Sequence, residues 1–506
     1  MSPSCGTRPA RGNAVKPDLR PGVEGTRSRL PTVAALSPRM WWAFLLPPLL
    51  ALSAQTLQSS QSHQSATFAV VGGTVVDGTG REPIEEGHVV MDGDRLTCVG
   101  TPEECPLPDG TETLDAQGRW VVPGLVDAHV HFSQSGWVDG RPDALDLREE
   151  HPYPEVVAEL RSAPERFFRT YLCSGVTAVF DVGGYPWTFD LRDAPQPRPD
   201  LAVAGPLLST RDHWVNLPAE RQFVHISDEG AVEEAVAYLS SRGSDAVKVW
   251  YLAEPGSADE ERFLPLLQRA GELAEARGIP LIVHATALET AKDAIRAGAH
   301  LLVHSVRDQE VDTEFLELAL AAGTIYNPTL VVHEGYHEIR ARHFRDTRYP
   351  LDCVDSVTFA KARSTQEIPG GLEPEDVAAS ARDLERQSRL LAENLLRVHE
   401  AGIPVAMGTD AGNPLTLHGP SVHHEMEAMV DAGMTPMEVL VASTRNGARA
   451  MGREDVLGTL EAGKRAHLLV LDSDPTESVA AFRDMSHLVV GGRLHTPAEF
   501  LPVDSP

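Results

Sequence analysis

Short apolar runs alternate with amphipathic stretches through the middle of the chain. Amphipathic stretches such as 228–243 and 259–278 have polar first turns and a Gly at the end, which predicts helices. The apolar runs are almost uninterrupted, as is typical of strands buried on both faces of a parallel sheet. There are eight such runs, at 121–132, 176–183, 201–205, 245–250, 281–285, 301–305, 324–330 and 404–412.

Eight buried strands that alternate with helices predict an α/β fold of the (β/α)8 TIM-barrel type. We assign residues 119–452 to this barrel. A doubly wound open sheet is the competing architecture, and it would place a Gly-rich phosphate loop after a strand. No GxGxxG follows any of the eight runs, so the barrel is favoured.

The two ends of the predicted barrel carry a different pattern. Residues 67–118 and 453–506 contain short alternating runs punctuated by Gly and Asp, which is typical of hairpins. We expect the two segments to combine into one small composite β-sandwich domain. Residues 333–400 are longer than a barrel connection requires, and we expect part of them to overhang the site.

The first 54 residues have the layout of a secretory signal peptide. Basic residues precede a short apolar run at 41–52, and small residues follow it. The run is shorter than the roughly 20 apolar residues that span a bilayer, so an uncleaved anchor is the less favoured alternative. A start at Met40 is a further alternative, although it would remove most of the basic residues. We therefore expect an exported protein, with a linker at 55–66 and no stable membrane anchor.

Composition restricts the partners. The formal net charge is -29, from acidic residues spread along the chain, so nucleic acid is not an expected partner. A homo-oligomer stays open. Four cysteines lie beyond the signal, without the close pairing of thiolate zinc sites. Cys98 and Cys105 suit a disulfide across a short loop, and four isolated thiols are the alternative.

Candidate metal ligands lie where the apolar runs end. His129 and His131 are two apart on one strand, so their side chains point the same way. His284, His304 and Asp410 each stand at the end of a later run. The carboxyl ends of barrel strands converge on one face, so these five side chains are expected to meet. Four imidazoles and one carboxylate suit zinc or a similar divalent ion.

Lys248 is unusual because it lies in the middle of an apolar strand. Burying its ammonium is costly, so the lysine requires either a neighbouring carboxylate or a chemical modification. His213 and Tyr251 are weaker candidates for contact with a substrate. The remaining histidines carry no spacing argument, and we expect surface or helix positions for His333, His418, His423 and His424.

Motifs along nearly the whole predicted fold resemble those of a known enzyme superfamily. They are GGTVVDGTGREPIEEGHVV, PGLVDAHVHF, GVTAVFDVGG, DAVKVW, GTDAG, AGMTPMEVLVASTRNGARAMG and LGTLEAGKRA. Together with His284 and His304 they resemble the imidazolonepropionase and prolidase-like branch of the amidohydrolase superfamily. The resemblance implies a hydrolase in which metal-activated water attacks an amide, dipeptide or cyclic amide bond. The implied substrate is a small-molecule amide or peptide.

The resemblance also implies a ligand set and a base. In members with two metals, the matching positions place one ion on His129, His131 and Asp410, and a second on His284 and His304. A carboxylated Lys248 bridges the two ions, which we expect to be zinc, and this would also remove the cost of burying a cation. Asp410 is then both a metal ligand and the general base that passes a proton to the leaving nitrogen.

Two other functions stay open. A mononuclear deaminase or imidazolone-type ring hydrolase would not use Lys248 as a ligand. Deaminase relatives often carry a Glu three residues after the fifth-strand histidine, and here that position is Ala287, with Glu289 two residues further on. The third function is a non-catalytic, amidohydrolase-fold binding protein. Such relatives usually lose metal ligands, whereas every ligand position is kept in this chain.

Overall fold

The computed structural model describes residues 67–502. The predicted signal peptide and linker lie outside the described residues. Among 67–502, no helix combines the length and apolar character needed to cross a membrane.

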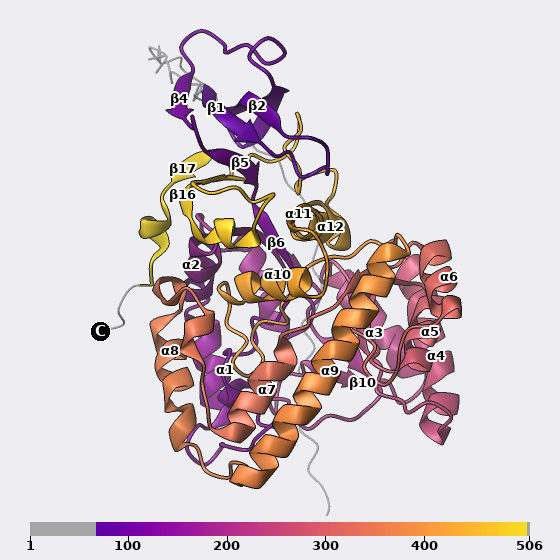
Figure 1. Cartoon of the computed structure of the whole chain (residues 1–506). Coiled ribbons are helices and arrows are strands. Elements are labelled where there is room, and N and C mark those ends of the chain that lie inside the picture. The colour runs from indigo at the N-terminus through magenta and orange to yellow at the C-terminus, as the bar shows by residue number, and fades with distance from the viewer. Residues whose placement is uncertain (1–66, 503–506) are drawn as a thin grey trace, which may run out of the picture. The chain divides into compact units, whose positions relative to one another are not determined.

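The strands of residues 67–502 form three sheets that together give a mixed α/β architecture with parallel strands at its centre (Figure 1). The first sheet contains β1 (Thr67–Val75), β2 (Ile84–Asp92), β3 (Arg95–Gly100), β4 (Glu112–Asp115), β5 (Trp120–Pro123), β15 (Leu468–Leu471), β16 (Met485–Val490) and β17 (Arg493–His495). The second contains β9 (Leu207–Ser209), β10 (Phe223–His225), β11 (Val247–Trp250), β12 (Leu281–His284), β13 (Ala299–Val303) and β14 (Ile325–Asn327). The third contains β6 (Leu125–Val130), β7 (Val176–Asp181) and β8 (Asp200–Val203).

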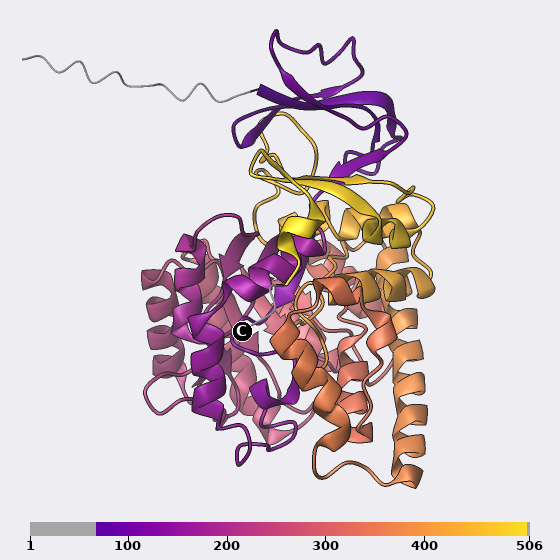
Figure 2. The same ribbon diagram turned by 90° about the vertical axis from the view of Figure 1, so that its left-hand side faces the viewer.

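The helices lie along the parallel strands and over one end of them (Figures 1 and 2). They are α1 (Tyr153–Ser162), α2 (Glu165–Cys173), α3 (Glu229–Ser241), α4 (Ala258–Glu275), α5 (Leu288–Arg296), α6 (Thr313–Ala322), α7 (Val332–Ala341), α8 (Ser356–Arg363), α9 (Pro374–Glu400), α10 (Ser421–Asp431), α11 (Pro436–Ala442) and α12 (Arg445–Ala450). Capping side chains determine where several of these helices begin. The side chains of Asp228, Ser257 and Asp312 accept hydrogen bonds from the first turns of α3, α4 and α6.

Hydrogen bonds connect the second and third sheets at both edges. Val203 of β8 accepts a backbone hydrogen bond from Asp245, which lies just before β11. On the other side, the segment 405–411 makes parallel bridges to Tyr326 of β14 and Val130 of β6. Eight parallel segments are thereby joined in sequence, an order consistent with the predicted barrel.

The interior of this arrangement is apolar and well packed. Each of the eight segments, or a residue next to it, contributes to one cluster of fully buried small and branched side chains. The members from these segments are Val126, Ala128, Ala178, Phe180, Ala202, Ala246, Ile282, Leu301, Val303, Ile325 and Ala406. A second, larger cluster packs the other side of the strands against the helices. Strands buried on both faces explain why the sequence shows uninterrupted apolar runs.

Three details differ from the sequence-based expectation. The first predicted strand, 121–132, is divided between β5, which pairs with β1 and β15 in the first sheet, and β6 of the third sheet. The eighth predicted strand, 404–412, forms isolated bridges instead of a regular strand. Its Gly408 and Gly412 and the turn that follows interrupt the strand pattern. In addition, β9 and β10 were not predicted, because strands of three residues are too short to leave a periodic pattern.

Strands from both end segments belong to one sheet. β5 pairs with β1 on one side and with β15 on the other, so the order runs from the last strands of the chain to the first. A shared cluster of buried side chains, including Val70, Val121 and Leu468, packs this sheet. The sandwich arrangement and the exact domain boundaries stay predictions.

Two disulfides are present among the described residues. Cys98 is bonded to Cys105 across the loop after β3, which was one of the two alternatives expected. Cys173, at the end of α2, is bonded to Cys353 across 180 residues. The alternative of isolated thiols is therefore wrong for these four cysteines. No local pattern could have paired Cys173 with Cys353, since only the fold brings α2 to the segment after α7.

Removing the Cys173–Cys353 bond by a double Ala substitution is expected to lower the free energy of unfolding by about 5 kcal/mol, because the bond closes a long loop. The matched control is the double Ala variant of Cys98 and Cys105. That bond closes a loop of only 7 residues, so a cost of about 2 kcal/mol is expected. Melting temperatures of the two variants are compared with that of the wild type. Equal decreases would contradict the loop-length argument.

Candidate metal centre

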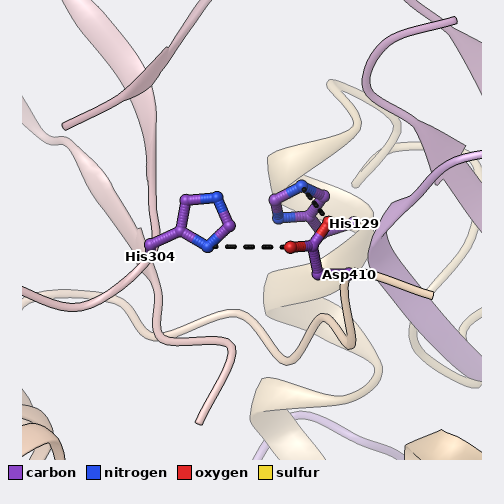
Figure 3. Close-up of side chains that lie close together, drawn as sticks. All are labelled: His129, His304 and Asp410. Atoms are coloured by element: carbon purple, nitrogen blue, oxygen red, sulfur yellow. Dashed lines mark ion pairs between the residues drawn. The ribbon is translucent and has the colours of Figure 1, made fainter. Parts of the chain in front are cut away.

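The carboxylate of Asp410 lies among three histidines. Figure 3 shows two of them, His129 and His304, on either side of it. Asp410 Oδ1 is 3.2 Å from His129 Nε2 and 3.0 Å from His131 Nε2. Its Oδ2 is 4.0 Å from His304 Nδ1. Candidate ligand atoms of His129, His304 and Asp410 all lie within 4.8 Å of one another, which is a group that could hold a metal ion.

His284 and Lys248 belong to the same cavity. The ring centroid of His284 is 4.5 Å from that of His304, which is in turn 5.0 Å from that of His129. All six predicted site residues line one cavity of about 520 Å³. The structure therefore brings together side chains that are far apart in the sequence, while their roles as ligands stay predictions.

The rings of His129 and His131 are held by hydrogen bonds of Nδ1, the ring nitrogen that faces away from the carboxylate. His129 Nδ1 is 3.1 Å from Asn327 Oδ1, and His131 Nδ1 is 2.7 Å from the Gly183 carbonyl oxygen. Partners of this kind fix the orientation of a ligand ring and leave the other nitrogen available to a metal. His304 differs, because its Nδ1 is 2.7 Å from Thr329 Oγ1 and is also the ring nitrogen nearest to Asp410.

The backbone around the carboxylate is also specialised. His304 and Asp410 both have positive φ, at 71° and 62°, a conformation that costs energy in residues other than glycine and is concentrated at functional sites. Gly408 lies so close to its neighbours that a Cβ would stand 2.8 Å from the Cβ of His129 and 2.4 Å from Asn327 Nδ2. Only glycine fits there.

Asp127 fixes the position of the segment that carries Asp410. Its Oδ2 accepts a hydrogen bond of 2.6 Å from the Thr409 hydroxyl, and its Oδ1 accepts one of 3.0 Å from the Thr409 backbone N–H. Burial raises the pKa of Asp127 to about 7, although these hydrogen bonds oppose the shift. The carboxyl therefore acts as a brace between β6 and the 405–411 segment.

The electrostatics of the site fit cation binding. Burial lowers the pKa of His129, His284 and His304 well below the usual value, so all three are neutral imidazoles, the form that binds metals. Burial acts to raise the pKa of Asp410, but the close contact of its carboxylate with His131 and the nearby His304 outweigh it, and the pKa is lowered. Asp410 is thus an anion at neutral pH.

Two buried atoms of the site have no hydrogen-bond partner within 67–502. They are His129 Nε2 and Asp410 Oδ1, which face each other. Buried polar atoms without partners are costly, and a bound ion is one way in which such atoms are satisfied. Neutral imidazoles, an anionic carboxylate and orphaned atoms that face one point fit a divalent cation.

Lys248 lacks the ion pair that was one of the two expected ways to offset its burial. It is only 3% exposed, and within the described part of the chain its ammonium makes no hydrogen bond or ion pair. Burial lowers its pKa to about 7, against the opposing charge of Asp410. At neutral pH a large fraction of this lysine is therefore the neutral amine.

The weaker candidates lie outside the cavity. His213 packs behind its wall, with ring centroids 4.7 Å from Phe223 and 5.2 Å from Trp250. Tyr251 is 2% exposed, does not line the cavity, and its hydroxyl has no partner among the described residues.

The expectation for the remaining histidines is partly wrong. His418 lies in a loop and is buried, bonded to the Tyr171 hydroxyl at 2.9 Å and to the Gln134 carbonyl oxygen at 2.9 Å. His423 and His424 lie on α10, as expected for helix positions, and His333 lies on α7. His333 also lines the cavity, which the sequence did not indicate.

Other cavity residues were missed. Asn327 ends an apolar run just as the predicted ligands do, so the same signal could have identified it. Arg141, Asp143 and Arg307 lie in loops after strands, where no periodicity distinguishes them. The overhanging segment contributes as expected, since side chains of α7 and α9 line the cavity. They are Val332, His333, Tyr336, His337, Arg340, Ser380, Asp383, Leu384 and Gln387.

Parallel strands whose ends carry imidazoles and a carboxylate around a candidate cation site define a metal-dependent hydrolase. A model of the amidohydrolase family matches residues 120–494, so the chain belongs to this family. It is a hydrolase that acts on carbon–nitrogen bonds.

Known proteins of similar sequence and fold agree with this membership. The chain is 26% identical over 433 residues to the imidazolonepropionase of Caulobacter vibrioides (strain NA1000 / CB15N), covering 78% of this chain and 90% of that protein. Its fold is similar to that of a Xaa-Pro dipeptidase with methionine bound in the active site, with a TM-score of 0.65, 22% identity, and coverage of 85% and 100%. It is also similar to A. niger ochratoxinase, with a TM-score of 0.64, 21% identity, and coverage of 86% and 96%.

Proposed function

We propose that the chain hydrolyses the amide bond of a small amide, dipeptide or cyclic amide with two zinc ions bridged by carboxylated Lys248. The observation that carries this proposal is the position of Asp410 among three histidines in the cavity. The proposal also takes the eight connected parallel segments as a closed barrel with the site at the carboxyl ends of its strands.

Each predicted ligand has a role in the proposal. His129, His131 and Asp410 hold one ion, and His284 and His304 hold the second. Divalent ions bound there lower the pKa of water and polarise a carbonyl group.

Asp410 moves the proton. Because its pKa is lowered, its carboxylate accepts the proton that the attacking water loses and then delivers it to the leaving nitrogen. The brace from Asp127 and the positive φ of Asp410 hold the carboxylate in one position, which favours this transfer.

A mononuclear deaminase or ring hydrolase is the second candidate. The imidazolonepropionase relatives favour it, but the residues around His284 do not support deamination. Ala287 cannot protonate a ring. Glu289 does not line the cavity, and its carboxylate accepts a hydrogen bond of 2.9 Å from Lys292.

Metal analysis of the purified protein tests the proposal. We expect about two zinc ions per chain, loss of amide hydrolysis after chelation, and recovery when zinc is restored. One ion per chain with full activity would favour the mononuclear alternative. Undiminished activity after complete removal of metal would contradict both, and absence of metal binding would favour a non-catalytic binding protein.

We also propose that the protein is exported. The predicted signal at 1–54 supports this, and so do the two disulfides, because disulfides persist mainly in oxidising compartments. Fractionation of cells that produce the full chain tests the localisation, and retention of the whole chain in the cytosol would contradict it.

A further inference from the structure

One wall of the cavity is apolar and aromatic. It consists of Leu207 on β9, Phe223 on β10 and Trp250 on β11. The ring centroids of Phe223 and Trp250 are 5.0 Å apart, and Trp250 is 5.8 Å from the ring of His284. A wall of this kind favours an aromatic or aliphatic group next to the candidate metal centre.

The charged side chains elsewhere in the cavity are mostly neutralised by partners. Arg141 forms two parallel hydrogen bonds of 2.9 and 2.8 Å with Asp143, and it also contacts Asn413. Asp383 on α9 is paired with Arg386. None of these groups is left with an uncompensated charge for a substrate.

Two arginines of the cavity differ from these groups. Arg307 and Arg340 both line the cavity with exposed side chains, and within the described residues neither has an ion pair or a side-chain hydrogen bond. Of the two, Arg307 is the one that follows β13 and His304 directly, and its positive charge lowers the pKa of His333, after the larger effect of burial. The guanidinium therefore acts on a group that lines the cavity.

The backbone that carries Arg307 is fixed at three consecutive residues. Val306 accepts a hydrogen bond of 2.9 Å from Asn394, and the Arg307 N–H donates one of 2.9 Å to the Thr286 carbonyl. The Asp308 carboxylate accepts one of 2.9 Å from the Leu288 N–H. A cation on a rigid loop is preorganised for an anionic ligand.

The order of strands separates the two features. The apolar wall lies on the neighbouring strands β10, β9 and β11, and Arg307 follows β13. His284 at the end of β12 lies between them, and His304 directly follows β13. A substrate whose bond is cleaved at the histidines thus has one flank at the aromatic wall and the other near Arg307.

We propose that the substrate is an anionic amide, with an aromatic or aliphatic group on one side of the cleaved bond and a carboxylate on the other. This inference rests on the proposed amide hydrolysis. Arg307 binds the carboxylate through charge-assisted hydrogen bonds, and the neighbouring His333 faces the same cavity without a hydrogen-bond partner among residues 67–502.

Two pairs of compounds test the proposal. N-benzoyl-L-leucine and N-benzoyl-L-leucinamide differ only in the carboxylate on the amine side. N-phenylsuccinamic acid and its primary amide place the same difference on the acyl side. Each compound is assayed for hydrolysis by the zinc-loaded enzyme, and compounds that are not hydrolysed are assayed for binding by calorimetry.

The wild type is expected to prefer the acid of at least one pair by about 10- to 100-fold in kcat/KM or Kd. Arg307→Gln is expected to lose that preference, because kcat/KM falls or Kd rises for the acid. For the matching amide, the same quantity should stay within about threefold of its wild-type value. The control is Arg277→Gln, which removes the same charge outside the cavity and should retain the preference.

The outcomes separate the two proposals. A clear acid preference in binding, lost in Arg307→Gln, with no compound hydrolysed would count against the proposed function and leave the carboxylate site standing. Hydrolysis with no acid preference would overturn the carboxylate site. An acid preference that persists in Arg307→Gln, or that is lost in Arg340→Gln instead, would also overturn it. Failure to bind or hydrolyse all four compounds would overturn it as well.

Discussion

Asp410→Asn is expected to lower kcat/KM for amide hydrolysis by about 10⁴-fold. The substitution removes the carboxylate whose oxygens lie 3.0 to 4.0 Å from ring nitrogens of His129, His131 and His304, and with it the group that moves the proton. Asparagine tolerates the positive φ of this position better than most residues, so the backbone should be preserved. Steady-state kinetics and a melting curve on the same preparation measure the two effects.

The matched control for this experiment is Asp383→Asn. Asp383 lines the same cavity but is paired with Arg386 on α9, and it forms no ion pair with a histidine among residues 67–502. Its substitution makes the same chemical change and should leave kcat/KM within about threefold of the wild type. Equal losses in the two variants would contradict the assignment of Asp410, and so would a large drop in the melting temperature that accompanies the loss of activity.

The sequence indicates the central fold because the burial of each strand determines the residues of that strand itself. A strand buried on both faces must be apolar throughout, so each parallel strand of normal length leaves a visible run. The exceptions are informative. β9 and β10 have three residues each, too few for a pattern, and 404–412 has an apolar run but is broken by glycines into isolated bridges.

The residues of the site also fall into a group that the sequence predicts and a group that it does not. His129, His304 and Asp410 stand at the ends of apolar runs, so one topological rule predicts that they meet. Residues that depend on tertiary contact leave no such signal. Arg307 is identified only from the structure, which shows that it lines the cavity and that its side chain has no partner among the described residues. Cys173 and Cys353 are 180 residues apart, and their bond likewise depends on the completed fold.

Lys248→Ala is expected to reduce the metal content from about two ions to one and to lower kcat/KM by about 10³-fold or more. The buried amine has a pKa of about 7 and no partner within residues 67–502, so its neutral form can add carbon dioxide. The nitrogen forms a bond to carbon and releases a proton, and the product is an anionic carbamate. A costly buried cation thereby becomes a ligand.

Chemical rescue distinguishes this role from a structural one. The space left in Lys248→Ala admits a small carboxylic acid, so acetate should restore part of the activity and the second ion. Lys248→Met fills the same space without a carboxylate, so acetate should have no effect on it. Enzyme prepared with ¹³C-bicarbonate should show a carbamate resonance in the wild type that both variants lack.

Two results would overturn the carbamate. One is a Lys248→Met enzyme that keeps two ions and the wild-type rate, since methionine cannot supply an oxygen ligand. The other is a wild type without a carbamate resonance that still binds two ions. In that case the lysine would be a neutral amine next to Asp410, and the two ions would have to share the histidines and that single carboxylate.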